Sequence, residues 1–171
     1  MRLVLIGITH HNCPIAEREK LAFSCQQQES MLRRMHTVHD ISEAVILQTC
    51  NRTEFYIYAN KNFDTEGFLA QLIAQFRPEG LGAWKNYSRQ KIGMDVVRHL
   101  FEVAAGLDSQ IIGENQILSQ LKSAYAQSLD CHMSKFIFHR LFHLAFSVAK
   151  AVRTNTTINR CLLYTSPSPR D

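Results

Sequence analysis

A cysteine between two strand-like segments is the residue of this sequence best suited to chemistry. Cys50 lies in Thr49-Cys50-Asn51-Arg52-Thr53-Glu54, after the apolar residues 44–47 and before the alternating stretch 55–58. A tight connection between strands holds a side chain where a substrate can reach it, and a cation two residues away favours the nucleophilic thiolate. Cys50 is therefore a candidate nucleophile for attack on a carbonyl carbon; the alternative is a buried, inert thiol.

A second candidate segment is bracketed by glycines. Residues 106–113 read Gly-Leu-Asp-Ser-Gln-Ile-Ile-Gly and carry polar groups that packing does not need. The segment leads into a predicted helix, and the NH groups at a helix N-terminus favour an anion. It therefore predicts a binding loop, with a plain connection between two helices as the alternative.

The elements that position these segments follow from the hydrophobic pattern. Strands are predicted at residues 3–8, 44–48 and 53–59, and helices at 15–21, 28–38 and 65–76. Pro78, Gly80 and Gly82 predict a loop followed by an extended piece over residues 84–88. From Gly93 onward the pattern is helical, at residues 94–105, 114–128 and 134–155. We expect an α+β fold, with a mixed α/β lobe and small sheet over residues 1–92 and a helical lobe over 93–160 that ends in a long helix.

Residues 161–171 break this pattern. They contain two prolines and no amphipathic period, and they resemble an in-frame translation of a sequencing adaptor. We expect a tail foreign to the fold, with a reading frame truncated near Arg160; an authentic disordered terminus is the alternative.

Composition restricts the class of protein. The 171 residues are 46% hydrophobic, which is enough for a core, and the longest apolar runs are too short to cross a bilayer. With no signal-peptide pattern, a cytoplasmic location and no membrane partner are expected. The five cysteines form no CxxC pair and predict reduced thiols. A net charge of +4 permits an RNA partner without requiring one.

Five motifs, taken in order, carry a resemblance to a known family. They are residues 7–14 with Arg18-Glu19, residues 49–54, residues 99–101 with 103–109, residues 113–118, and Lys150 with residues 152–154. Together they resemble the N-terminal part of the glutamyl-tRNA reductase family, over residues 1–158. Cys13, Ser119 and Asn155 depart from the usual family residues.

The resemblance implies a mechanism and a set of site residues. Cys50 would attack the ester that joins glutamate to tRNA, and NADPH would reduce the resulting thioester to glutamate-1-semialdehyde for tetrapyrrole (porphyrin and haem) synthesis. Arg52 would hold the substrate α-carboxylate and Glu114 its ammonium group. The other residues that match the family's glutamate pocket are Thr49, Asn51, Ser109, Asn115, Gln116 and Gln120.

His99 matches a histidine that is functionally important in the family. It could polarise the carbonyl or manage a proton at Cys50, whereas a histidine without this motif is more often a surface or hydrogen-bonded helix residue. His139 and His143 lie one helical turn apart, near Cys131 and His132, but no fourth well-spaced ligand follows. No metal site is therefore expected.

The resemblance also implies partners. They are glutamyl-tRNA, a second copy of the full-length chain in a homodimer, and the downstream aminomutase. No three of the seven glycines form G-x-G-x-x-G, so the NADPH-binding domain is expected to be missing and this fragment to stop at the thioester. Two other classes remain open: a Cys/His acyl hydrolase, and a non-catalytic RNA-binding or helical interaction module.

Overall fold

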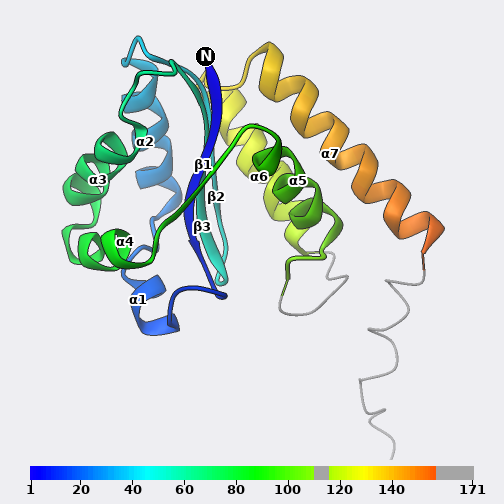
Figure 1. The fold of residues 1–171 in the computed structure, drawn as a ribbon, viewed down its shortest axis with the longest axis horizontal. Coiled ribbons are helices and arrows are strands. Elements are labelled where there is room, and N and C mark those ends of the chain that lie inside the picture. The colour runs from blue at the N-terminus through cyan, green and yellow to red at the C-terminus, as the bar shows by residue number, and fades with distance from the viewer. Residues whose placement is uncertain (110–115, 157–171) are drawn as a thin grey trace, which may run out of the picture.

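One antiparallel sheet of four strands lies at the centre of the molecule (Figure 1). The computed structural model describes residues 1–109 and 116–156. Strands β1 (Arg2–Thr9), β2 (Ile41–Gln48), β3 (Arg52–Ala59) and β4 (Arg89–Ile92) are arranged in the order β2-β3-β1-β4. Successive side chains of a strand point to opposite faces of the sheet, so β3 contributes to both faces. A hydrophobic core covers each face.

Four helices accompany the first face. They are α1 (Ile15–Glu19), α2 (Cys25–His36), α3 (Thr65–Phe76) and α4 (Leu81–Tyr87), with a 3-10 turn, η1 (Pro78–Gly80), before α4. Phe55 and Ile57 of β3 pack in this core with Trp84 of α4. The Trp84 and Phe55 rings meet edge to face, with their centroids 5.4 Å apart.

The three C-terminal helices cover the second face (Figure 1). They are α5 (Met94–Ala105), α6 (Gln116–Asp130) and α7 (Phe136–Asn155). Tyr56 of β3 packs here against Phe142 of α7, with ring centroids 5.9 Å apart. The predicted α+β class, with a small sheet followed by helices and a long final helix, is confirmed.

A buried carboxylate joins α7 to the sheet. Glu43 of β2 is 2% exposed, and its side chain accepts hydrogen bonds from the backbone NH groups of Lys135, Ile137 and Phe138 at 2.8, 3.1 and 2.8 Å. The first NH groups of a helix have no partner within the helix, and a negative charge is favourable there. Glu43 thus fixes the start of α7 on the edge strand of the sheet.

Two helices have the predicted bounds, at residues 65–76 and 94–105. The extended piece predicted at residues 84–88 is wrong, because α4 covers Leu81–Tyr87 and the strand follows at Arg89–Ile92. The glycines predict a loop, but α4 starts directly after the 3-10 turn and buries Ala83 and Trp84. The division at residue 92 stays a prediction, and the tail at 161–171 lies outside the described residues. No helix in the described part of the chain is long and apolar enough to span a membrane.

Candidate active site

Cys50 lies in the turn that joins β2 to β3. The backbone NH of Thr49 donates to the carbonyl oxygen of Arg52 at 2.9 Å, which closes the turn. The Thr49 hydroxyl accepts from the backbone NH of Asn51 at 3.1 Å. Cys50 between them is exposed, which removes the alternative of a buried thiol.

Two groups from the β1–α1 region hold this turn from outside. The backbone NH of His10 donates to the carbonyl oxygen of Asn51 at 2.8 Å. The guanidinium of Arg18, 9% exposed, donates to the carbonyl oxygens of Cys13 at 2.6 Å and Cys50 at 3.4 Å. The backbone at Cys50 is therefore anchored while its thiol stays accessible.

A small cleft brings together most of the residues predicted to bind glutamate. We call it the Cys50 cleft. Its lining consists of Thr49, Cys50, Asn51, Arg52, Ser109, Gln116, Ile117 and Gln120. These residues come from the β2–β3 turn, the segment after α5 and the first turns of α6. Glu114 and Asn115 were predicted for the same pocket and lie outside the described residues.

The end of α5 directs Ser109 to this cleft. Gly106 adopts a left-handed conformation with φ 77°, which side chains disfavour and which is common where a helix ends. The backbone NH of Leu107 then donates to the carbonyl oxygen of Glu102 at 2.9 Å. The chain turns here toward β3, so Asp108 and Ser109 meet the strand that carries Arg52.

Arg52 is the centre of a buried ion-pair network. It is 2% exposed, and its Nη1 atom lies 2.9 Å from Oδ2 of Asp108 and 3.2 Å from Oε1 of Glu54. Its Nη2 atom donates to the backbone carbonyl oxygen of Asp108. Both the side chain and the backbone of residue 108 are therefore held by one guanidinium.

Glu54 is shared among three partners. Its Oε1 atom lies 2.7 Å from Nε2 of His99, and its Oε2 atom accepts from the hydroxyl of Tyr56 at 2.8 Å. Burial by itself raises the pKa of Glu54, but hydrogen bonding to His99 and the charges of His99 and Arg52 lower it overall. Burial, together with the adjacent Glu54 charge, raises the pKa of Tyr56 well above its usual value. The buried network is thus built on an ionised Glu54.

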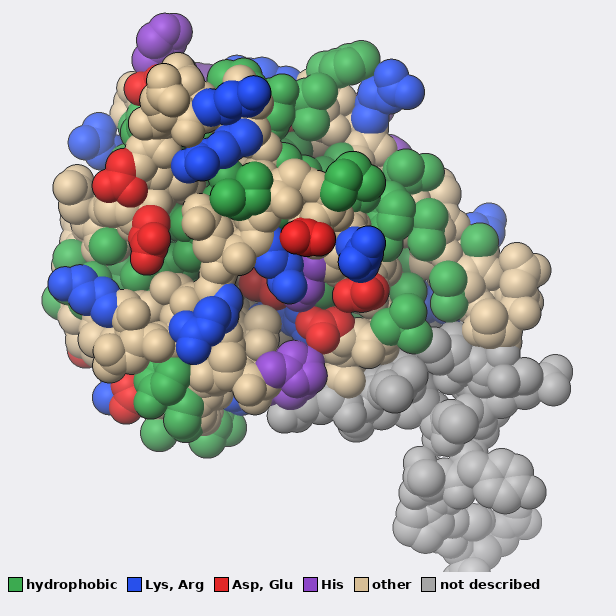
Figure 2. All heavy atoms as spheres, in the orientation of Figure 1, with side chains coloured by type: hydrophobic (Ala, Val, Ile, Leu, Met, Phe, Trp, Pro, Cys, Tyr) green, Lys and Arg blue, Asp and Glu red, His purple; other side chains and the backbone are tan. Residues whose placement is uncertain are grey.

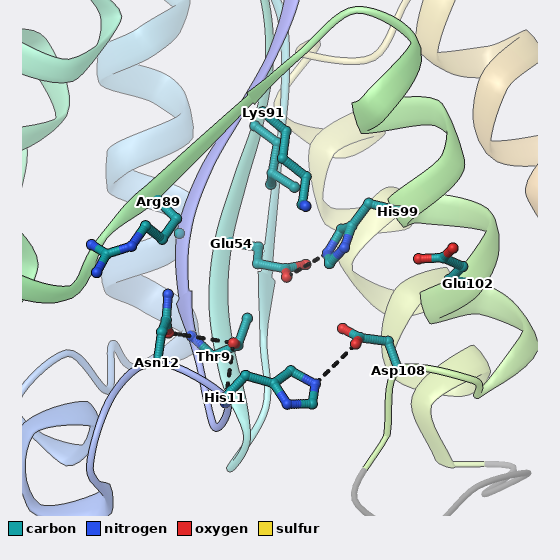
Figure 3. A pocket seen from close by; sticks show the side chains of 11 residues that line it. Thr9, His11, Asn12, Glu54, Arg89, Lys91, His99, Glu102 and Asp108 are labelled. Carbon is teal, nitrogen blue, oxygen red and sulfur yellow. Dashed lines mark hydrogen bonds and ion pairs between the residues drawn. The ribbon is translucent and has the colours of Figure 1, made fainter.

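His99 lines a different cleft, which we call the β4 cleft. This cleft has a volume of about 260 Å³ and lies between β1, β4 and α5. Figure 3 shows His99 directed at Glu54 and His11 directed at Asp108; Lys91 of β4 lies near His99, whereas Arg89 of β4 points away from both pairs. Acidic, basic and histidine side chains gather near the middle of this face of the molecule (Figure 2).

The structure therefore does not place His99 in the lining of the Cys50 cleft. The two clefts are linked through Arg52, which lines the Cys50 cleft and pairs with Asp108 and Glu54 of the β4 cleft. His99 reaches Arg52 through Glu54. Its predicted role at Cys50 stays a prediction, and the observed geometry makes it a buried partner of Glu54.

Three members of this network, Glu54, Asp108 and His11, have no predicted role. Arg52 and Glu54 are two residues apart on a strand, so their shared face was a usable signal. No local pattern shows that Asp108 returns to Arg52 or that His11 approaches Asp108 at 3.0 Å. His10 is a further candidate for a residue of the site. Its Nδ1 atom is buried with no hydrogen-bond partner in the described structure. Burial and nearby cations lower its pKa.

Among the described residues, the other cysteines and histidines form no comparable site. Cys13, Cys25, Cys50 and Cys131 are free thiols, and burial raises the pKa of Cys13 and Cys131. Within residues 1–109 and 116–156 no group of three or more His, Cys, Asp or Glu side chains could hold a metal ion. The Nδ1 atom of His139 is hydrogen-bonded to the hydroxyl of Tyr125 at 2.9 Å.

The fold and the site define an α+β domain that presents an exposed cysteine beside a polar cleft and a buried ion-pair network. The chain belongs to the glutamyl-tRNA reductase family. Its residues 6–156 match the family model described as the glutamyl-tRNAGlu reductase N-terminal domain.

Individual relatives agree with this family. The chain is 39% identical to a glutamyl-tRNA reductase of Syntrophobacter fumaroxidans over 91% of its length, and 39% identical to that of Geobacter sulfurreducens over 92%. The solved structure of glutamyl-tRNA reductase from Methanopyrus kandleri matches with a TM-score of 0.73 and 31% identity over 90% of this chain. The chain spans about a third of each relative, at 34%, 36% and 35% of their lengths.

Proposed function

We propose that this chain is the part of a glutamyl-tRNA reductase that transfers glutamate from glutamyl-tRNA to Cys50. The observation that carries the proposal is the Cys50 cleft, in which an exposed thiol lies among hydroxyl, amide and guanidinium groups from three separate segments. Membership of the family supports the choice of substrate.

In the proposed step the sulfur of Cys50 attacks the carbonyl carbon of the glutamyl ester. A carbon–sulfur bond forms, the bond from that carbon to the ribose oxygen breaks, and the thiol proton ends on the departing hydroxyl group. The product is a thioester, which is more electrophilic than the ester, together with free tRNA. Water attack on this thioester would release glutamate and regenerate the thiol.

Arg52 is proposed to supply the positive charge that attracts the α-carboxylate of the substrate. Arg52 lines the Cys50 cleft, and Asp108 and Glu54 hold its guanidinium in one position, which lowers the cost of ordering it when substrate binds. Glu114 is proposed to pair with the substrate ammonium group, and Thr49, Asn51, Ser109, Asn115, Gln116 and Gln120 to complete the glutamate pocket.

The family resemblance extends the proposal to the cofactor, the assembly, a partner and the location of the full-length protein. It names NADPH as the reductant of the thioester, a homodimer as the assembly of the full-length protein, the downstream aminomutase as a partner, and the cytoplasm as the location. The described residues do not fit a dinucleotide: the sheet is antiparallel, and no glycine-rich turn in the described ranges leads from a strand into a helix. The step proposed for the described residues is therefore formation of the thioester.

Intact-mass analysis tests the proposal. The chain is incubated with glutamyl-tRNA and quenched with acid, and a glutamyl adduct on the wild-type protein is expected. Cys50→Ser should abolish the adduct, whereas Cys25→Ser is the matched control, because Cys25 is the other exposed thiol of the described residues. No adduct and no Cys50-dependent loss of glutamate from tRNA would contradict the proposal.

The Cys/His acyl hydrolase is not favoured. His99 is bonded to Glu54 and lines the β4 cleft, so a direct pair with Cys50 is not observed. A simple glutamate-free ester distinguishes the two activities. A general hydrolase should turn it over, whereas the proposed glutamyl transfer requires the glutamyl group.

A further inference from the structure

A groove lined by amide side chains opens beside the Cys50 cleft, between α2, β2 and α6. Its glutamines are Gln28, Gln48, Gln116, Gln120 and Gln127. Gln116 and Gln120 line the Cys50 cleft as well, so the two hollows share a wall. We call this hollow the glutamine groove.

The lining of the groove is almost entirely uncharged. The described residues that line it include no Lys, Arg, Asp, Glu or His, and Cys25 is the only titratable one among them. Ser119 and Ser123 add hydroxyl groups, and Ile46 and Ala124 add apolar surface. Its volume of about 310 Å³ is near the lower end of the sizes typical of small-ligand sites. A neutral ligand of nucleoside size, with apolar faces and a hydrogen-bonding edge, matches these properties.

Internal hydrogen bonds hold some of these amides in place and leave other groups available. Gln48 both accepts from the backbone NH of Phe23 at 2.8 Å and donates to its carbonyl oxygen at 2.9 Å. Gln28 donates to the same carbonyl oxygen at 3.2 Å, and Gln127 donates to the carbonyl oxygen of Cys25 at 3.0 Å. The Oε1 atoms of Gln28 and Gln127 accept no hydrogen bond from the residues that the structure describes.

The shared wall has free hydrogen-bonding groups too. The side-chain amides of Gln116 and Gln120 make no hydrogen bond within the described part of the chain, and they stand between the groove and the thiol cleft. A molecule in the groove is therefore placed next to whatever group Cys50 attacks.

The chemistry of the proposed step identifies the group that lies next to the reacting carbonyl. When Cys50 attacks an aminoacyl ester, the leaving group is the ribose of the 3′-terminal nucleoside, which is adenosine in every transfer RNA. Glutamine amides can pair with adenine through one acceptor and one donor. We propose that the glutamine groove binds this terminal adenosine during acylation of Cys50, an inference that rests on the proposed function.

The test compares two activated forms of glutamate. The probes are 2′(3′)-O-glutamyl adenosine and the ethyl ester of glutamate, and the readout is the rate of Cys50 acylation by intact mass. Each rate is divided by the rate of the same ester with a small free thiol, which removes the difference in intrinsic reactivity. The test variant combines Gln28→Ala on α2 with Gln127→Ala on α6. The control is Gln26→Ala, a residue of α2 that does not line the groove.

We expect the wild type to prefer the adenosine ester by about tenfold or more after this correction. The double variant should lose most of that preference, while Gln26→Ala keeps it; circular dichroism establishes that both variants are folded. Equal corrected rates for the two esters, or a preference unchanged in the folded double variant, overturn the inference and leave the proposed function standing. If neither ester nor glutamyl-tRNA acylates Cys50, the proposed function fails and the inference with it.

Discussion

Asp108→Asn isolates the charge that fixes the segment after α5. The substitution keeps the size of the side chain and removes its charge. It weakens the contact of Oδ2 with Arg52 at 2.9 Å and of Oδ1 with His11 at 3.0 Å. The bond from Arg52 to the backbone carbonyl oxygen of residue 108 remains available.

The magnitude follows from the burial of the two pairs. A hydrogen bond to a charged group contributes about 1.5–3 kcal/mol, and the asparagine oxygen retains part of it as a neutral acceptor. The His11 side chain is 59% exposed, so that pair adds about 0–1 kcal/mol. We expect the free energy of unfolding at pH 7 to fall by about 1–2 kcal/mol.

The loss should depend on pH in a defined direction. Burial raises the pKa of Asp108, but the charge and hydrogen bond of Arg52 outweigh it and hold the pKa below its ordinary value of 3.8. A carboxyl with a lowered folded-state pKa stabilises the protein above its unfolded-state pKa, and this contribution disappears as pH falls through the folded-state value. The difference between wild type and variant should therefore be full at pH 7 and shrink below about pH 3.8.

Urea denaturation followed by tryptophan fluorescence measures both quantities. Trp84 is the single tryptophan and is fully buried, so its emission reports unfolding. His11→Asn is the control, because it removes only the exposed partner and should cost less than about 1 kcal/mol. An undiminished stability at pH 7, or an equal loss at pH 7 and at acid pH, would refute the reasoning.

Three further predictions concern the framework of the site. Glu43→Gln should lower the free energy of unfolding by about 2–4 kcal/mol in urea denaturation, because a neutral amide cannot satisfy three backbone NH groups. The control is Glu29→Gln, which removes an exposed ion pair with Arg33 and should cost less than about 1 kcal/mol. Similar losses for both would contradict the role of Glu43. Gly7→Ala should cost about 1–3 kcal/mol, because its Cβ atom would lie 2.6 Å from the carbonyl oxygen of Thr53, whereas Gly82→Ala meets no atom within 4 Å and should not destabilise the helix. In alkylation followed by mass spectrometry, Cys25 and Cys50 should react in the native protein, and Cys13 and Cys131 only after unfolding, because burial protects them and raises the pKa of both; native labelling of Cys131 would argue against this core.

Local signals made several elements predictable. The helix at Thr65–Phe76 begins after Asp64, whose carboxylate accepts from the backbone NH of Gly67 at 3.0 Å. The helix at Met94–Ala105 ends at Gly106 in the left-handed conformation. Such caps are encoded within a few residues, so the bounds could be read from the sequence.

The missed helix α4 shows the limit of local signals. Gly80 and Gly82 favour a break, whereas in the structure α4 buries Ala83 and Trp84 in the first core, where Trp84 contacts Phe55, 29 positions away in the sequence. Tertiary packing overrides weak local preference in short helices.

By itself the sequence determined the chemical character of the site. Cys50 follows an apolar run and precedes an alternating segment, which places it between two strands, and the period of the second strand puts Arg52 and Glu54 on one face. The tertiary structure alone decided which charges meet: Arg52 pairs with Asp108, 56 positions away, and Glu54 with His99, 45 positions away. A buried charge needs a partner in space, and only the packing of α5 on the sheet determines which residue that is.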